Sequence, residues 1–143
     1  MRYFKSKRII PAIYAALAAT VVIAASSCSK TYPAKSETDI ADFLAGAGIT
    51  VTESCTHKTV TIPEEFGEVY ERYNELQKEQ GFDLTRYRNR EAEVYTFRVV
   101  SVDGGHTDLT EAHVMVCDGI VIGADISSPA ISGEMKPVIS DQR

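Results

Sequence analysis

The chain has 143 residues, and its shares of 44% hydrophobic and 24% charged residues are typical of a globular protein with one domain. Four of its 15 Lys and Arg residues lie within the first eight positions, whereas the first acidic residue is Glu37. The other 11 basic residues face 20 acidic ones, which gives the chain after the N-terminal segment a net charge of −9. This charge argues against a nucleic-acid partner, because binding to phosphates depends on Lys and Arg.

The N-terminal segment predicts export. Residues 9–25, IIPAIYAALAATVVIAA, carry no charge and follow basic residues, which is the order found in a secretory signal. The length of this apolar run lies between the roughly 7 to 15 residues of a signal and the about 20 residues of a membrane span. We expect residues 1–28 to be a signal or a membrane anchor, and the domain that follows to lie outside the cytoplasm, at the outer face of the cell membrane.

A cysteine directly follows this apolar segment. Ala25-Ser26-Ser27-Cys28 resembles the lipobox of bacterial lipoproteins, in which small residues precede a cysteine that is lipidated and becomes the new N-terminus. The resemblance implies lipid attachment at Cys28, although Ala25 stands where Leu is commoner and Ser27 where Gly or Ala is commoner. An uncleaved N-terminal anchor and ordinary cleavage with free secretion remain the alternatives.

A polar stretch and a short helix come next. Residues 29–36 are polar and include a proline, which predicts a tether between the membrane and the domain. Ser36 and Asp39 resemble a capping box, with Asp in place of the usual Glu. The apolar residues that follow have helical spacing, and they are Ile40, Phe43, Leu44 and Ala47. This pattern predicts an amphipathic helix that ends at Gly46 or Gly48.

Two β-branched stretches and a second helix follow. Residues 49–53 (ITVTE) and 58–62 (KTVTI) alternate in polarity, which predicts a hairpin whose turn is formed by residues 54–57. Pro63 and several acidic residues then favour the start of a helix over about 64–80 that stops at Gly81. Its predicted apolar stripe consists of Phe66, Val69, Tyr70, Tyr73 and Leu76.

The last part of the domain reads as three strands. Residues 94–102 predict a strand, residues 103–106 a turn, and residues 112–126 a hairpin around Asp118-Gly119. A two-residue turn fixes the register, and it pairs Cys117 with Ile120, Met115 with Ile122, and His113 with Ala124. We expect the bulkier side of this hairpin, with Met115, Ile120 and Ile122, to face the helices. Asn89 is expected to adopt a left-handed turn conformation.

These elements predict the fold class. The order α-β-β-α-β-β-β indicates an α+β domain, a two-layer sandwich of two helices and an antiparallel sheet of about five strands. We expect the domain to span residues 37–135 and residues 136–143 to form a tail, with room for one short edge strand after about residue 128.

Two stretches resemble a known family. Residues 62–100, IPEEFGEVYERYNELQKEQGFDLTRYRNREAEVYTFRVV, and residues 114–135, VMVCDGIVIGADISSPAISGEM, are similar to the domain-of-unknown-function 4830 family of small exported bacterial proteins, mainly from Gram-positive anaerobes. The most specific parts are RYNELQKEQGFDL and DGIVIGAD, and the resemblance runs over most of residues 40–135. Ala124 and Asn89 stand where the family favours Gly. The resemblance implies the fold and export, and it implies no catalytic residue and no cofactor.

Several polar residues have the chemistry of a metal site or of acid and base groups. His57, His106 and His113, with Asp108, contain ligand types that suit zinc-like ions, but their spacing matches no tight ligand motif. The carboxylates of the second predicted helix have the spacing of a solvated face, and they are Glu64, Glu65, Glu68, Glu71, Glu75 and Glu79. We therefore expect neither a metal ion nor a cofactor.

The cysteines of the domain allow two sharper hypotheses. Cys55 and His57 lie two residues apart on an extended segment, so their side chains point to the same side, as a nucleophile and its base would need. If Cys28 carries a lipid, Cys55 and Cys117 are left, and a possible disulfide between them would stabilise the fold by ~4 kcal/mol. Cys117 could equally be a small buried hydrophobic residue.

The sequence favours a non-enzymatic binding or protein-interaction module, tethered to the membrane at the cell envelope, because it contains no coherent set of catalytic residues. One alternative is a small extracytoplasmic enzyme that uses Cys55 and His57. Another is a structural or regulatory subunit of an envelope complex. The possible partners are the membrane itself, through the lipid or anchor, and an unknown envelope protein or small ligand.

Overall fold

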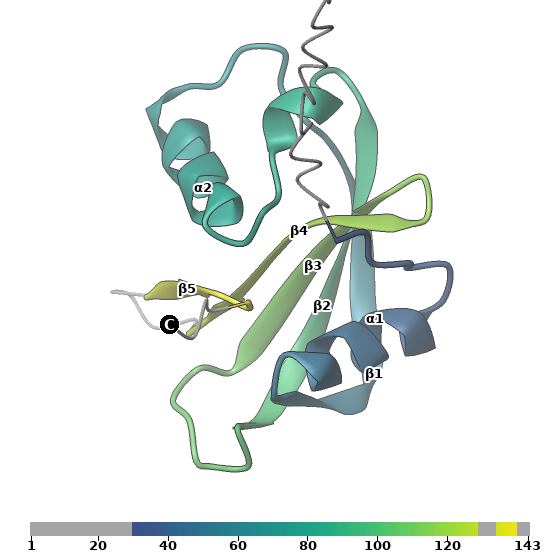
Figure 1. The fold of residues 1–143 in the computed structure, drawn as a ribbon, viewed down its shortest axis with the longest axis vertical. Coiled ribbons are helices and arrows are strands. Elements are labelled where there is room, and N and C mark those ends of the chain that lie inside the picture. The colour runs from purple at the N-terminus through teal and green to yellow at the C-terminus, as the bar shows by residue number, and fades with distance from the viewer. Residues whose placement is uncertain (1–29, 129–133, 140–143) are drawn as a thin grey trace, which may run out of the picture.

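The computed structural model describes residues 30–128 and 134–139, so the predicted signal and Cys28 lie outside the described residues. The elements in chain order are α1 (Glu37–Gly46), β1 (Ile49–Thr61), α2 (Glu68–Lys78), the 3-10 helix η1 (Leu84–Tyr87), β2 (Glu91–Val102), β3 (Glu111–Cys117), β4 (Ile120–Ser127) and β5 (Met135–Pro137). The strands form one antiparallel sheet in the order β1-β2-β3-β4-β5 (Figure 1). The α+β class, the two α-helices and the five antiparallel strands are thereby confirmed.

The first predicted hairpin is wrong, because residues 49–61 form the single strand β1 of 13 residues. β1 pairs along its length with β2. The register shift between Thr50 and Val51 is a bulge in β2, and the shift between Val51 and Cys55 accommodates extra residues of β1. Residues 54–57 contain no Gly, Pro, Asn or Asp, the residues that tight turns favour. The order of elements is therefore α-β-α-β-β-β-β rather than α-β-β-α-β-β-β.

The two α-helices pack against opposite faces of the sheet. Val114 and Val116 of β3 belong to one core cluster, which includes Leu44 of α1, whereas Met115 and Cys117 belong to a second cluster, against which α2 packs. Successive residues of a strand point to opposite faces, so the clusters lie on the two sides of the sheet. Figure 1 shows α1 beside β1 and β2 and α2 near β4. The helices thus do not share one layer, which differs from the expected two-layer arrangement.

The start of α1 confirms the predicted capping box. The Asp39 amide donates to Ser36 Oγ at 3.2 Å, and the Ser36 amide donates to the Asp39 carboxylate at 3.0 Å. Ile40, Phe43 and Leu44 are buried, as their helical spacing predicts.

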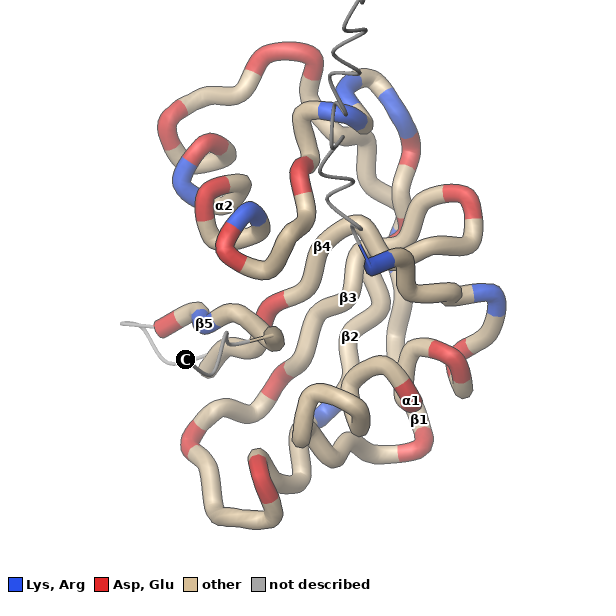
Figure 2. Tube along the Cα trace, viewed as in Figure 1, with Lys and Arg blue, Asp and Glu red and all other residues tan. Residues whose placement is uncertain are grey.

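The helix α2 begins at Glu68 rather than near residue 64, and its predicted apolar stripe is only partly correct. Val69 is 83% exposed, whereas the buried residues of α2 are the two amides Asn74 and Gln77. Asn74 Oδ1 accepts a hydrogen bond from the Leu84 amide at 2.8 Å. This bond explains why a polar side chain of α2 is buried. Acidic and basic residues alternate along the exposed side of α2, where they form ion pairs (Figure 2).

The last hairpin has the predicted turn but a different register beyond it. Asp118 and Gly119 have φ values of 51° and 73°, as a type I′ turn requires, and Cys117 pairs with Ile120. A register shift then pairs Met115 with Gly123 and His113 with Asp125, so both predicted partners are wrong by one residue. The reason is a bulge in β4, which no turn residue in the sequence reveals. The left-handed conformation of Asn89 is confirmed by its φ of 59°.

Both ends of the described chain belong to the fold. Pro33, expected in the polar tether, forms a bridge with Ile120, and the Val121 amide donates to the Tyr32 carbonyl at 2.9 Å. Ala34 and Val138 are buried, so parts of the expected tether and tail complete the core. The outer edge of β4 is therefore covered by residues 32–34 at one end and by β5 at the other. Within residues 30–128 and 134–139, neither α-helix has the length and apolar character that a bilayer crossing requires.

Candidate functional site

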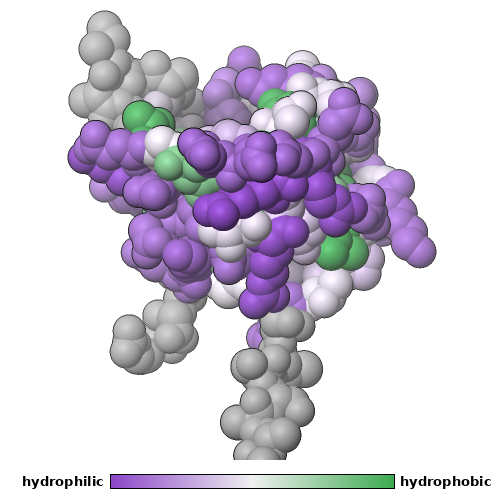
Figure 3. All heavy atoms as spheres, turned by 90° about the horizontal axis from the view of Figure 1, so that it is seen from above, coloured by the Kyte–Doolittle hydropathy of each residue, from purple (hydrophilic) through white to green (hydrophobic). Residues whose placement is uncertain are grey.

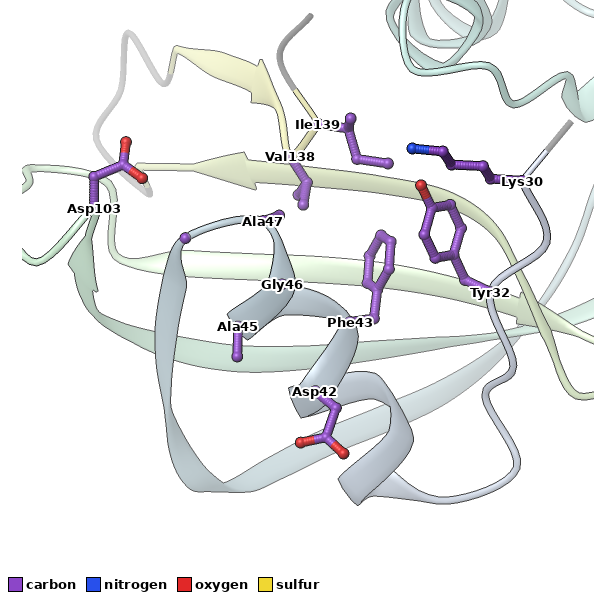
Figure 4. Close-up of a pocket in the computed structure, with 11 residues that line it drawn as sticks. Lys30, Tyr32, Asp42, Phe43, Ala45, Gly46, Ala47, Asp103, Val138 and Ile139 are labelled. Carbon is purple, nitrogen blue, oxygen red and sulfur yellow. The ribbon is translucent and has the colours of Figure 1, made fainter. Parts of the chain in front are cut away.

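A cavity of about 720 Å³ lies between the C-terminal end of α1, the turn after β2, residues 30–32 and residues 138–139. Its apolar lining comes from Phe43, Ala47, Val138 and Ile139, as Figure 4 shows. Its polar lining includes Lys30, Tyr32 and Asp103. The cavity thus joins residues from the beginning, the middle and the end of the domain.

One wall of the cavity is aromatic and held in place by the backbone. The rings of Tyr32 and Phe43 pack edge to face, with centroids 4.8 Å apart and an interplanar angle of 63°. The centroid of the Tyr32 ring also lies 6.1 Å from that of the Phe82 ring. The backbone carbonyl of Tyr32 accepts a hydrogen bond from the Val121 amide of β4. Because α1 and the edge of β4 fix these two rings, the wall is preformed.

The opposite end of the cavity is fixed by a close contact between two turns. The Asp103 amide donates to the Gly48 carbonyl at 2.7 Å. Gly48 has a φ of +81°, and a Cβ at this position would lie 2.2 Å from Asp103 Oδ1. A side chain would be strained at this φ, so the turn that contacts Asp103 favours glycine here.

The charges at the two ends of the cavity differ in sign. The C-terminal end of α1 lines the cavity and has no basic residue in its last turn, so its partial negative charge is not offset there. Asp103 lies at this end and Lys30 at the other, while the Asp42 side chain points away from both (Figure 4). The cavity thus has a negative end, an apolar middle and a positive end.

Cys55 and His57 lie on the same face of β1, as predicted, but the thiol is not activated. The His57 ring packs against Tyr95, with centroids 5.4 Å apart. Burial, and then the negative charge of the adjacent Glu37, raise the pKa of the Cys55 thiol. A cysteine nucleophile needs the opposite shift, because the thiolate is the reactive form. These surroundings do not favour nucleophilic chemistry at Cys55.

The predicted disulfide is not present, and both Cys55 and Cys117 are free thiols. Cys55 packs with the α1-side cluster and Cys117 with the α2-side cluster. The ladder pairs Cys55 with Phe97 and Phe97 with Ala112, five residues before Cys117. This geometry separates the two Cα atoms by roughly 19 Å, whereas a disulfide allows about 7 Å at most. Cys117 is instead a small buried residue, and its Sγ donates to the Glu91 carbonyl at 3.4 Å.

The three histidines are not brought together. His106 and Asp108 are fully exposed in the turn after β2, His57 lies on the α1 side of the sheet, and His113 pairs with Asp125 on the α2 side. Across residues 30–128 and 134–139, no group of three or more His, Cys, Asp or Glu side chains is placed to hold a metal ion.

A buried polar cluster, which the sequence did not predict, lies between α2 and the sheet. Asp125 is only 2% exposed, and its Oδ1 accepts a hydrogen bond from the Tyr73 hydroxyl at 3.0 Å. His113 lies beside Asp125 on β3, with its ring nitrogens 3.0 Å from Thr96 Oγ1 and 3.3 Å from Ser127 Oγ. The sequence signal for this cluster is the acidic residue within the apolar stretch IVIGADI. That residue, Asp125, faces Tyr73 only in the observed register.

The model of a protein family described as "Domain of unknown function (DUF4830)" matches residues 43–126, more than half of the chain. The chain belongs to the DUF4830 family. No curated protein and no solved structure matches it. The DUF4830 match runs from α1 to β4 and contains Tyr73, His113 and Asp125, whereas Lys30 and Ile139 of the cavity lie outside the matched residues.

Proposed function

We propose that this DUF4830 domain is a non-enzymatic binding module, held at the outer face of the cell membrane by its N-terminal segment, and that the cavity beside α1 is its ligand site. The lining of the cavity carries the proposal, since an aromatic wall and an apolar middle lie between charged groups of opposite sign. Its volume also falls within the roughly 300–1,000 Å³ common for ligand pockets. Its lining fits an elongated amphipathic molecule with a cationic group toward Asp103 and an anionic group toward Lys30.

The position of the cavity relative to the N-terminal segment supports this role. Lys30 follows Cys28 by two residues and lines the cavity. Tyr32, which is fixed to β4, is four residues from Cys28. Four residues of a fully extended chain reach at most about 14 Å. A lipid on Cys28 would therefore keep the site close to the membrane surface, where amphipathic molecules collect.

The exposed surface supports a small ligand rather than a broad protein partner. Among the described residues, the large hydrophobic side chains that are exposed are Val69, Val100 and Met135, and each comes from a different element. Figure 3 shows a largely hydrophilic face on which hydrophobic residues form small separate patches. Protein interfaces usually bury larger contiguous apolar patches than these.

The test uses three probes that differ only at their ends. Aminooctanoic acid carries an ammonium group, an apolar chain and a carboxylate, whereas octanoic acid lacks the ammonium group and octylamine lacks the carboxylate. We expect the amide NMR signals of Phe43, Ala47 and Ile139 to shift most with aminooctanoic acid, because this probe matches both charged ends of the cavity. Equal shifts with all three probes would count against the proposed charge pattern.

Matched variants test the location of the site. Ala47→Phe places a ring in the apolar middle of the cavity, where the chain of aminooctanoic acid would lie, and should strongly weaken its binding. Val69→Phe adds the same ring at an exposed position of α2 and should leave binding unchanged. Unaltered titration of the Ala47→Phe variant would rule out this cavity as the site. The membrane location is tested separately by mass spectrometry of the mature chain, since a first residue upstream of Cys28 would exclude lipid attachment.

A further inference from the structure

The helix α2 is held on the sheet by hydrogen bonds from its buried amide side chains, in addition to the packing of Tyr70 and Tyr73 against the α2-side cluster. Its two buried residues are Asn74 and Gln77, and Gln77 Oε1 accepts from the Ala124 amide of β4 at 2.7 Å. Just after the helix, Gln80 Nε2 donates to the Ala124 carbonyl at 2.8 Å. Amphipathic helices usually dock through an apolar face. The docking of α2 therefore depends on the polar groups beneath it as well as on the packing of its two tyrosines.

One of these polar groups is ionisable. Asp125 is 2% exposed, and its Oδ2 has no hydrogen-bond partner among the described residues. An ionised carboxylate with an unpartnered, buried oxygen is much more strongly disfavoured than a protonated carboxyl in the same place. Burial raises the pKa of Asp125, and the charge of His113 and the hydrogen bond from Tyr73 oppose this shift.

The groups around Asp125 define what controls its ionisation. On the α2 side these are Tyr73 and, against its ring, Tyr70. On β3 the group is His113, whose Nε2 lies 3.7 Å from a carboxylate oxygen of Glu111. On β5 the residue opposite Asp125 is Pro137, which carries no charge. Of these groups, His113 contributes the charge that favours ionised Asp125.

We propose that Asp125 makes α2 a proton-dependent latch, in which the protonated carboxyl keeps α2 docked on β4 and its ionisation releases the helix. Because the pKa of Asp125 is higher in the docked state, its contribution to docking is complete below about pH 3.9, the value for an unfolded chain, and is lost as the pH rises through the docked-state value. Release would uncover the apolar residues against which α2 packs, including Leu84, Met115 and Ile122.

The experiment follows the carboxyl and the helix in the full chain between about pH 4 and pH 9. Carbon NMR of the Asp125 carboxyl should show a midpoint above the ordinary range, and the hydrogen-exchange protection factors of the α2 amides should fall with the same midpoint. Asp125→Asn keeps an acceptor oxygen for Tyr73 and never ionises, so α2 should stay protected throughout. Asp108→Asn changes a fully exposed carboxylate and should leave the wild-type profile unchanged.

A second variant distinguishes the latch from a structural role and does not depend on the folding of Asp125→Asn. His113→Asn removes the positive charge that favours ionised Asp125, so the midpoint of release should move to higher pH. The proposal is overturned if the carboxyl titrates near pH 3.9, if α2 protection does not follow its titration, or if His113→Asn moves the midpoint to lower pH.

Discussion

Replacement of Gln80 tests most directly how residues 138 and 139 are held against the domain. Its Nε2 donates to the Ala124 carbonyl at 2.8 Å, and its Oε1 accepts from the Val138 amide at 2.8 Å and the Ile139 amide at 3.0 Å. The side chain therefore connects the backbone of β4 to the backbone of the segment after β5 by hydrogen bonds. Gln80→Met keeps the size and helix preference of the side chain and removes these three bonds, together with the longer bonds that Nε2 donates to the Leu76 carbonyl and to Gln77 Oε1, both at 3.3 Å.

The expected loss of stability follows from the burial of the partners. Ala124 is fully buried and Val138 is 6% exposed, so water has little access to their freed backbone groups. An unsatisfied buried group costs about 1–3 kcal/mol, whereas the Ile139 amide is half-buried and regains a bond to water. Taking the lower part of this range for each of the two buried groups, we expect Gln80→Met to lower the free energy of unfolding by about 2–3 kcal/mol.

Urea unfolding measures the total effect, and hydrogen exchange of the Val138 and Ile139 amides locates it. Glu79→Met, at the adjacent exposed position, should change the free energy of unfolding by less than about 0.5 kcal/mol. Gln80→Glu keeps the acceptor for both amides and loses the donor to Ala124, so both amides should stay protected while stability falls. A free energy of unfolding and amide exchange rates equal to those of the wild type in Gln80→Met would show that Gln80 does not hold this segment.

Three further predictions follow from local features. Gly119→Ala places a side chain at a φ of +73° and should lower the free energy of unfolding by about 1 kcal/mol in a urea titration. Glu93 raises the pKa of Tyr95 to about 12 through a hydrogen bond, so Glu93→Gln should move the Tyr95 midpoint toward about 10 in an ultraviolet absorbance titration. A thiol assay in denaturant without reductant should find Cys55 and Cys117 both reactive, and a disulfide between them would contradict the fold.

Local sequence signals account for the parts of the fold that were predicted correctly. The capping box at Ser36 and the Asp118-Gly119 turn depend on residues within four positions of one another, and both are confirmed. The hairpin predicted within residues 49–62 failed because alternation identifies extended backbone but does not distinguish one long strand from two. Only the absence of turn residues at 54–57 could have indicated the single strand β1.

The candidate sites were not predictable, because they depend on contacts between distant residues. Asn74 and Gln77 have the composition of a solvated helix face, and they are buried because the backbones of Leu84 and Ala124 need hydrogen-bond partners. The cavity combines Tyr32 with Ile139, which no local pattern connects. Asp125 reaches Tyr73 only through the bulge in β4, which shifts the register by one residue.

Gln80 connects the latch to the cavity. It lies two residues after α2, and the two amides that it binds belong to Val138 and Ile139, which form one wall of the cavity. Release of α2 would free this wall, so a ligand that packs against it should bind the docked state more tightly. Linkage is reciprocal, so such a ligand should raise the pH at which α2 is released, and its affinity should fall as the pH rises. Titration of α2 protection with and without aminooctanoic acid measures this shift, and an unchanged midpoint in the presence of bound probe would show that the two sites are independent.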